Sequence, residues 1–179
     1  MKSRVDVGLL GSLCAVAFLN LISIQAGSFP HIQTEDTSDC LLCRQCGYDV
    51  SDVIHLHRRF SPSALVRGNQ SLFGPQRVEY QVLENPLGIQ FKVVTVARAR
   101  CAATEEWHSE FSWFPGYAWK HCLCIHCGHH LGWIFEPLAT AVKGQVGPTN
   151  QGFYAIILDN ILSEKFSDSL LIIPRVFKS

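Results

Sequence analysis

Short runs of apolar and β-branched residues, separated by turn residues, dominate the middle of the chain. The clearest are residues 78–83 and 89–97, and the second contains the segment FKVVTV, whose β-branched side chains favour strands. Shorter runs at 65–66 and 72–73 are each followed by a glycine-containing turn. No long window shows the 3.6-residue period of an amphipathic helix. The pattern therefore predicts a mostly β fold of antiparallel sheets.

Further segments on either side continue this pattern less regularly. Residues 50–60 alternate only in part, and Pro62 ends the alternation. A glycine-rich connection at 143–152 precedes the apolar run FYAIILDNIL at 153–162, which predicts another strand. The final run, LLIIPRV at 170–176, predicts a last strand or a short tail.

The N-terminus has the pattern of a targeting segment. Lys2 and Arg4 give it a basic start, residues 7–24 are mostly apolar, and the small residues Ala26-Gly27-Ser28 follow. This order is typical of a signal peptide, here residues 1–26, and it predicts a secreted chain. The alternative is a retained membrane anchor, because about 18 apolar positions approach the length of a membrane span. The polar side chain of Asn20 weighs against that alternative.

The length and charge of the chain limit the number of domains and the kinds of partner that we expect. The 179 residues have room for one domain, which we place at 40–165, after a flexible lead-in at 27–39 and before a C-terminal tail or last strand at 166–179. Fifteen basic residues balance fifteen acidic ones, so no net field attracts nucleic acid or an anionic membrane. In a secreted chain, Asn69-Gln70-Ser71 is a glycosylation sequon.

Two C-x-x-C pairs indicate a metal site. Cys43 and Cys46 form the first pair, and Cys124 and Cys127 form the second. Each pair places two thiolates on a tight turn, which spans one edge of a zinc tetrahedron, and Gly47 allows the first turn. The alternative is disulfide bonding, which a secretory route permits. A structural zinc contributes on the order of 10 kcal/mol of folding free energy against about 2–4 kcal/mol for a disulfide, so we expect zinc.

Three further cysteines remain once Cys14 leaves with the signal peptide. Cys40 and Cys122 each lie just upstream of a C-x-x-C pair, so metal binding would bring them close together. We therefore hypothesise a Cys40–Cys122 disulfide, which leaves Cys101 as a free thiol.

Large aromatic residues gather around the second C-x-x-C pair. Trp113 and Trp119 flank a Pro115-Gly116 turn, and Trp133 and Phe135 are two residues apart, so on a strand they face the same side. Rings on either side of a forced turn, with another pair on a neighbouring strand, can wall a small pocket. The alternative is that these are ordinary core aromatics of a small β domain, and the spacing alone favours that alternative.

A longer sequence motif around these residues favours the pocket over the ordinary core. The segment HSEFSWFPGYAWKHCLCIHCGHHLGWIF, residues 108–135, resembles the signature of the CULT domain, the thalidomide-binding domain at the C-terminus of cereblon. The first cysteine pair, CRQC, and the turn Asn85-Pro86-Leu87-Gly88 also fit the family. The likeness covers about residues 40–135, with a looser match into 153–162. The whole chain resembles the secreted, single-domain members of that family.

The resemblance implies a β-tent, in which a structural zinc holds two antiparallel sheets together. It also implies an aromatic cage with four members: Trp113, Trp119 and Trp133 as its walls and Phe135 as its base. In the family, a cyclic imide hydrogen-bonds mainly to backbone groups at the positions of Phe111 and Trp113, and the position of Asn85 lies beside the pocket. Many members have histidine where Phe111 stands, but because those contacts come from the main chain we expect the pose to survive.

The expected function is therefore that of a non-catalytic binding module. Its expected ligands are cyclic imides, such as glutarimides and thalidomide-like compounds, or uracil-like rings, and they include imides formed at protein C-termini. Zinc is the expected cofactor. The family's adaptor role in a ubiquitin ligase depends on other domains, and we do not expect that assembly here.

Two other functions remain open. Three tryptophans also make a cage for a quaternary ammonium group through cation–π attraction, although Glu110 and Glu136 lie only at its flanks. The family's fold also resembles that of zinc-containing methionine sulfoxide reductases, whose chemistry uses a cysteine of low pKa, and Cys101 is the candidate. A structural thiol is the more frequent outcome for such a cysteine, so we expect no enzyme.

Overall fold

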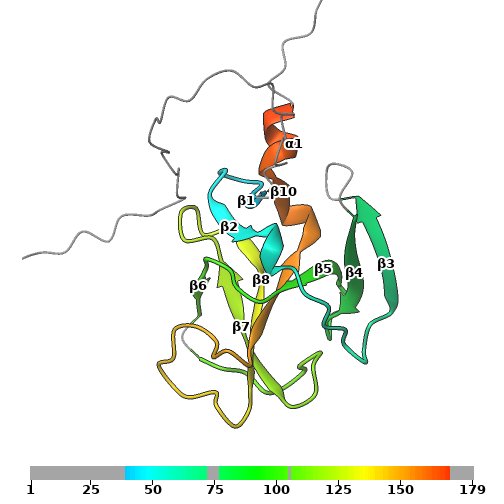
Figure 1. The fold of residues 1–179 in the computed structure, drawn as a ribbon. Coiled ribbons are helices and arrows are strands. Elements are labelled where there is room, and N and C mark those ends of the chain that lie inside the picture. The colour runs from blue at the N-terminus through cyan, green and yellow to red at the C-terminus, as the bar shows by residue number, and fades with distance from the viewer. Residues whose placement is uncertain (1–38, 72–76, 105, 170–179) are drawn as a thin grey trace, which may run out of the picture. The chain divides into compact units, whose positions relative to one another are not determined.

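The computed structural model describes residues 39–71, 77–104 and 106–169, which all lie in one unit, Asp36–Ser179 (Figure 1). The predicted signal peptide and residues 27–38 of the predicted lead-in lie outside the described residues, as does the predicted last strand at 170–176. Within the described ranges, no helix is long and apolar enough to span a membrane.

Seven strands form the larger of two sheets. In chain order they are β3 (Val66–Ser71), β4 (Arg77–Glu84), β5 (Gln90–Val96), β6 (Ala102–Ala103), β7 (Tyr117–Leu123), β8 (His130–Pro137) and β9 (Phe153–Ile157). They lie in the order β3-β4-β5-β9-β8-β7-β6, and every neighbouring pair is antiparallel. The runs at 78–83 and 89–97, which predicted strands, form β4 and β5.

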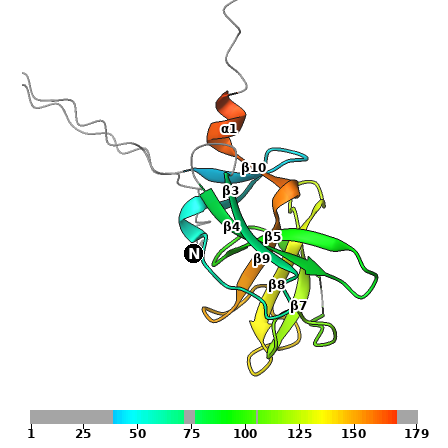
Figure 2. The same ribbon diagram turned by 90° about the vertical axis from the view of Figure 1, so that its right-hand side faces the viewer.

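Three short strands form the smaller sheet. They are β1 (Cys40–Cys43), β2 (Asp49–Asp52) and β10 (Ile161–Ser163), in the antiparallel order β10-β1-β2. Figures 1 and 2 show this sheet at the end of the larger one from which the chain continues out of β9 into β10. Two antiparallel sheets confirm the predicted mostly β class.

The central strand of the larger sheet explains the long apolar run at 153–162. Every residue of β9 is buried, and β5 and β8 pair with it on its two sides. The run is not one strand, however, because a 3₁₀ turn at Leu158–Asn160 interrupts it before the chain enters the smaller sheet as β10. The prediction of a single strand was wrong in its length, since apolar character marks burial and does not require a continuous strand.

Other segments also differ from the sequence pattern, and the glycine-containing turn predicted after residue 66 was wrong, because residues 67–69 lie within β3 and pair with β4. After β2, residues 53–55 form a 3₁₀ turn, which begins where the Asp52 side chain accepts a hydrogen bond of 2.9 Å from the Ile54 N–H. This local side-chain contact ends the strand, and hydrophobic alternation gives no signal for it. Near the other end, residues 164–169 form the short helix α1 (Glu164–Ser169), so the described part of the predicted tail is helical.

Gly132 in β8 allows the backbones of β8 and β9 to approach closely. Its φ angle is 150°, and a Cβ built there would lie 2.0 Å from the carbonyl oxygen of Ala155. We expect Gly132→Ala to lower the free energy of unfolding by roughly 3 kcal/mol, because one strand must move to admit the methyl group. Gly147→Ala is the control, since its Cβ would meet only the Tyr154 hydroxyl at 3.8 Å. Denaturant unfolding of both variants measures the difference, and equal stabilities would contradict this packing.

Candidate functional site

Two similar turns carry the C-x-x-C pairs. Cys43 ends β1, and the N–H groups of Cys46 and Gly47 donate to its carbonyl oxygen at 3.3 and 2.8 Å. In the β7–β8 hairpin, the Gly128 N–H donates to the Cys124 carbonyl oxygen at 2.8 Å. Gly47 and Gly128 have φ angles of 74° and 72°, a conformation that glycine adopts without steric cost. The glycine after each pair therefore lets the chain turn tightly enough for its two thiols to converge.

The four thiols meet where the two sheets come together. Cys43 Sγ lies 3.8 Å from Cys127 Sγ, and Cys46 Sγ lies 3.6 Å from Cys124 Sγ. All four sulfur atoms lie within 4.8 Å of one another. Zn–S bonds of about 2.3 Å in a tetrahedron place the sulfurs about 3.8 Å apart, so the cluster has the size that such an ion requires. A metal ion held here would join the smaller sheet to the larger one.

The thiols differ in how readily they ionise. Burial opposes ionisation of Cys124, yet hydrogen bonds from the backbone N–H groups of Cys127 and His126 outweigh it and lower the pKa of Cys124 to about 7. Burial raises the pKa of Cys46 to about 12. Cys124 therefore ionises more readily than Cys46. The charge of a bound cation favours ionisation of the other three thiols.

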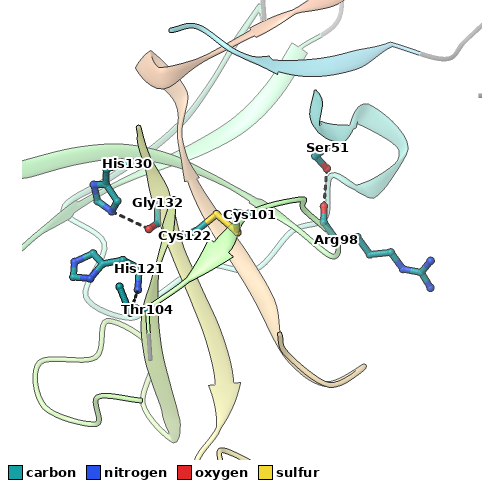
Figure 3. The surroundings of a disulfide bond; sticks show 8 residues. All are labelled: Ser51, Arg98, Cys101, Thr104, His121, Cys122, His130 and Gly132. Atoms are coloured by element: carbon teal, nitrogen blue, oxygen red, sulfur yellow. Dashed lines mark hydrogen bonds between the residues drawn. A yellow bond between two sulfur atoms is a disulfide. The ribbon is translucent and has the colours of Figure 1, made fainter. Parts of the chain in front are cut away.

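A disulfide joins Cys101 to Cys122 (Figure 3). Cys40 is a free thiol. The hypothesis of a Cys40–Cys122 bridge was therefore wrong, and so was the assignment of Cys101 as the free thiol. Ala103 in β6 pairs with Cys122 in β7, which brings the preceding segment to Cys122 with the bridged Cα atoms 5.3 Å apart. Cys40 is three residues before Cys43 on a strand, so the two side chains face opposite sides of the smaller sheet.

A hollow of about 350 Å³ opens beside β7 and β8. All six residues predicted to bind a ligand line it: Asn85, Phe111, Trp113, Trp119, Trp133 and Phe135. Strands carry Trp119, Trp133 and Phe135, whereas the loop before β7 and the turn between β4 and β5 carry the other three. Two adjacent strands thus fix one wall, and two loops close the others.

The tryptophans enclose the hollow without filling it. Trp113 and Trp133 meet edge to face, with ring centroids 4.6 Å apart and an angle of 78° between their planes. No ring contact joins Trp119 to either of them in the part of the chain that the structure describes. At the base, Phe135 is 1% exposed and stacks on Phe153 of β9 with centroids 5.1 Å apart. An apolar slot therefore remains between the indoles.

Hydrogen bonds hold two of the indoles in place. Trp113 Nε1 donates to the Glu84 carbonyl oxygen at 2.7 Å, and Trp119 Nε1 donates to the Glu110 carbonyl oxygen at 2.9 Å. The side-chain oxygen of Asn85 accepts two N–H bonds of 3.0 and 2.9 Å within its own turn. These side chains therefore fix the shape of the slot and its rim.

Phe111, which lines the hollow, has an uncommon main-chain conformation. Its φ angle is 57°, which is rare outside glycine and which clusters at functional sites. Among the residues described, neither the N–H nor the C=O of Phe111 makes a hydrogen bond, and the N–H of Trp113 makes none. The Trp113 carbonyl, in contrast, accepts a bond from the Ser61 hydroxyl. One backbone acceptor and two backbone donors are thus unpaired, among the described residues, in two residues that line the slot.

Five lining residues were not predicted from the sequence: Pro86, Leu87, Phe91, His121 and His130. The rings of His121 and His130 lie 5.1 Å apart and point to the same side of the sheet (Figure 3). Burial, with a smaller effect of neighbouring histidines, lowers the pKa of both, so both are neutral at pH 7. His121 follows Trp119 by two residues on β7, so strand alternation carried a signal for it. His130 required knowledge of the strand pairing.

Comparison with known proteins supports a relationship to cereblon. No family model matches the chain. Cereblon of Gallus gallus is 37% identical over 79 residues, which are 44% of this chain and 16% of that protein. Cereblon of Drosophila persimilis is 35% identical over 88 residues, 48% of this chain and 13% of that protein, and cereblon of Xenopus tropicalis is 38% identical over 65 residues, 36% of this chain and 14% of that protein.

These matches confirm the resemblance to the cereblon-like CULT domain that the aromatic string indicated. They also limit the extent of the resemblance, because the chain spans no more than 16% of the length of these three relatives. The similarity therefore concerns one region of a longer protein.

The Cys101–Cys122 bridge makes a testable contribution to stability. We expect Cys101→Ser to lower the free energy of unfolding by about 3 kcal/mol, because the bridge closes a loop between residues 21 apart and restricts the unfolded chain. Cys40→Ser is the matched control and should change stability by less than about 0.5 kcal/mol. Denaturant unfolding without reductant measures both. Peptide mapping that found Cys40 in a native disulfide would refute the pairing.

Proposed function

We propose that the chain is a non-catalytic module that binds a cyclic imide or a uracil-like ring in the hollow between Trp113, Trp119 and Trp133. The observation that carries the proposal is the unpaired backbone edge of Phe111 and Trp113 beside an apolar slot of about 350 Å³. The similarity to cereblon adds support. Imides formed by cyclisation at protein C-termini belong to the same ligand class.

A cyclic imide suits the slot in two ways. The apolar faces and methylene edges of its ring bury against indoles. Its C=O, N–H, C=O edge needs one acceptor flanked by two donors, which are the groups unpaired at Phe111 and Trp113. Leaving the imide N–H unpaired would cost about 1–3 kcal/mol, so that group decides selectivity. A ring of about ten heavy atoms supplies modest free energy, and we expect micromolar affinity.

The quaternary ammonium alternative has less support. No carboxylate lines the hollow within the described residues. Glu136 is completely buried, and its carboxylate accepts hydrogen bonds of 2.6 Å from the Thr140 hydroxyl and 2.8 Å from the Thr149 N–H. Cages for such cations often combine rings with a carboxylate, and here the rings stand alone.

The reductase alternative depended on Cys101 as a reactive thiol of low pKa. Cys101 is bonded to Cys122, which is completely buried. The neighbouring thiol with a lowered pKa, Cys124, belongs to the four-cysteine cluster. We therefore propose binding without catalysis.

We also propose that the metal in the cysteine cluster is zinc. Four cysteine thiolates at tetrahedral distances are a donor set typical of structural zinc sites, which keep no open position for substrate. In this role the ion supplies folding free energy and no chemistry. Its ligands fix the β7–β8 hairpin, which carries Trp119 and Trp133, against the smaller sheet.

Metal content tests the zinc proposal. We expect elemental analysis to find one zinc ion per chain, and we expect Cys43→Ser to lose the metal and most of the cooperative unfolding transition, because a structural zinc contributes on the order of 10 kcal/mol. Cys40→Ser, a thiol of the same strand outside the cluster, should keep both. Purified protein with fully cooperative unfolding and no bound metal would rule out the proposal.

A ligand titration followed by tryptophan fluorescence tests the binding proposal. We expect thalidomide and uridine to bind, and the N-methylated imide to lose binding because its N–H is gone. Trp119→Ala should weaken imide binding at least tenfold, since a wall of the slot is removed. Trp107→Ala is the control, because Trp107 does not line the hollow. Binding of a trimethylammonium compound with no binding of any imide would favour the alternative cage.

A further inference from the structure

A second cleft, of about 580 Å³, shares no lining residue with the aromatic hollow. Four parts of the chain contribute to it: residues 57–59, residues 97–98 after β5, residues 148–152 before β9, and Tyr154 of β9 itself. Polar side chains form much of its wall, namely His57, Arg59, Arg98, Thr149, Asn150 and Tyr154. The first two segments are held together by the backbone, since the Ala97 N–H donates to the His55 carbonyl oxygen at 2.8 Å.

The cleft is lined by two arginines without acidic partners. Within the ranges that the structure describes, neither Arg59 nor Arg98 forms an ion pair. The arginines beside them in sequence behave differently, because Arg58 and Arg100 each pair with a carboxylate. No acidic side chain among the described residues lines this cleft.

One carboxylate lies behind the cleft wall. Gly152 lines the cleft, and a Cβ built on it would lie 2.5 Å from Glu136 Oε2. Glu136 is completely buried, and both of its oxygens accept hydrogen bonds from Thr140 and Thr149. The cleft therefore has two arginines in its lining and one hydrogen-bonded carboxylate behind its wall, so the net charge around it is positive.

The two guanidinium groups are placed differently. Arg59 donates from Nη1 to the Tyr117 hydroxyl, and its guanidinium carbon lies 4.6 Å from the Phe153 ring centroid. These contacts use one of five N–H donors and hold the group in position, so little conformational freedom remains to be lost on binding. Arg98 extends outward from the loop after β5, and in Figure 3 only its backbone carbonyl is engaged, by the Ser51 hydroxyl at 2.7 Å.

One buried polar atom at the cleft lacks a hydrogen-bond partner among the described residues, and the hydroxyl of Tyr154 makes no hydrogen bond to them either. Tyr154 is 9% exposed, and its hydroxyl bonds to no residue that the structure describes. Burial raises the pKa of Tyr154, so the hydroxyl stays a donor at neutral pH. The buried atom without a partner is Nε2 of His57. Buried polar groups are nearly always hydrogen-bonded, so an unpaired one at a cleft indicates a missing ligand or solvent partner.

We propose that this cleft binds a phosphate or sulfate group carried by an organic molecule of about the size of a sugar. Arg59 and Arg98 supply the charge and the forked N–H donors that match such oxyanions, and Tyr154 supplies a neutral donor. A cleft of about 580 Å³ is larger than an inorganic anion needs and falls within the range of organic ligand sites. The chain has no net charge, so the positive charge at this cleft results from how folding places Arg59 and Arg98.

Isothermal titration at low ionic strength, with glucose 6-phosphate, glucose 6-sulfate, inorganic phosphate and glucose, tests the proposal. We expect one or both esters to bind and glucose not to bind. Arg98→Gln should weaken ester binding about tenfold or more, because a charge-assisted hydrogen-bonding group is lost. Tyr154→Phe should weaken it by about threefold to tenfold. Arg100→Gln is the matched control, since it removes the same charge two residues away and outside the cleft.

The outcomes separate a built site from general attraction. Tighter binding of an ester than of inorganic phosphate supports the whole proposal, and the stronger ester identifies the anion. Equal affinity for the ester and inorganic phosphate overturns the sugar-sized part and keeps the oxyanion site. Equal effects of Arg98→Gln and Arg100→Gln, or no heat of binding with any probe at millimolar concentration, overturn the proposal. Circular dichroism of each variant excludes unfolding as the cause.

Discussion

The convergence of four cysteine sulfurs between two sheets is the contact on which the rest of the structure depends. The smaller sheet has strands of three or four residues, too short to be stable without packing against another element. Two of the sulfurs belong to the turn that joins its strands, and two belong to the β7–β8 hairpin of the larger sheet. The same hairpin carries Trp119, Trp133 and Phe135 of the aromatic slot. The tight turns that Gly47 and Gly128 allow therefore determine both where the two sheets meet and where the aromatic slot lies.

Much of this was predictable because its signals are local. Two cysteines on a turn have a fixed spacing, and a β-branched run such as FKVVTV favours a strand wherever it lies. Trp133 and Phe135 face the same side because strand alternation has a period of two. The six lining residues and the four thiols could therefore be named from the sequence and its resemblance to a known domain, and the structure brings each set together.

What escaped prediction depends on pairing between distant strands. The Cys101–Cys122 bridge follows from the register of β6 against β7, which no spacing along the chain reveals. The division of one apolar run between two sheets depends on where β9 leaves its neighbours. The basic cleft combines arginines from two segments with a tyrosine from a third, in a chain with no net charge. Secondary structure is encoded locally here, whereas proximity across the fold is not.

Phe153 stands at a junction between the two cavities. Its ring stacks on Phe135 at the base of the aromatic slot, and the Arg59 guanidinium of the basic cleft lies over it. A single buried side chain of the central strand thus touches one residue of each site. If a ligand in one cavity displaces this ring, the affinity of the other cavity changes, and thermodynamic linkage makes the effect identical in both directions. The packed middle of the sheet therefore connects the two cavities through one side chain.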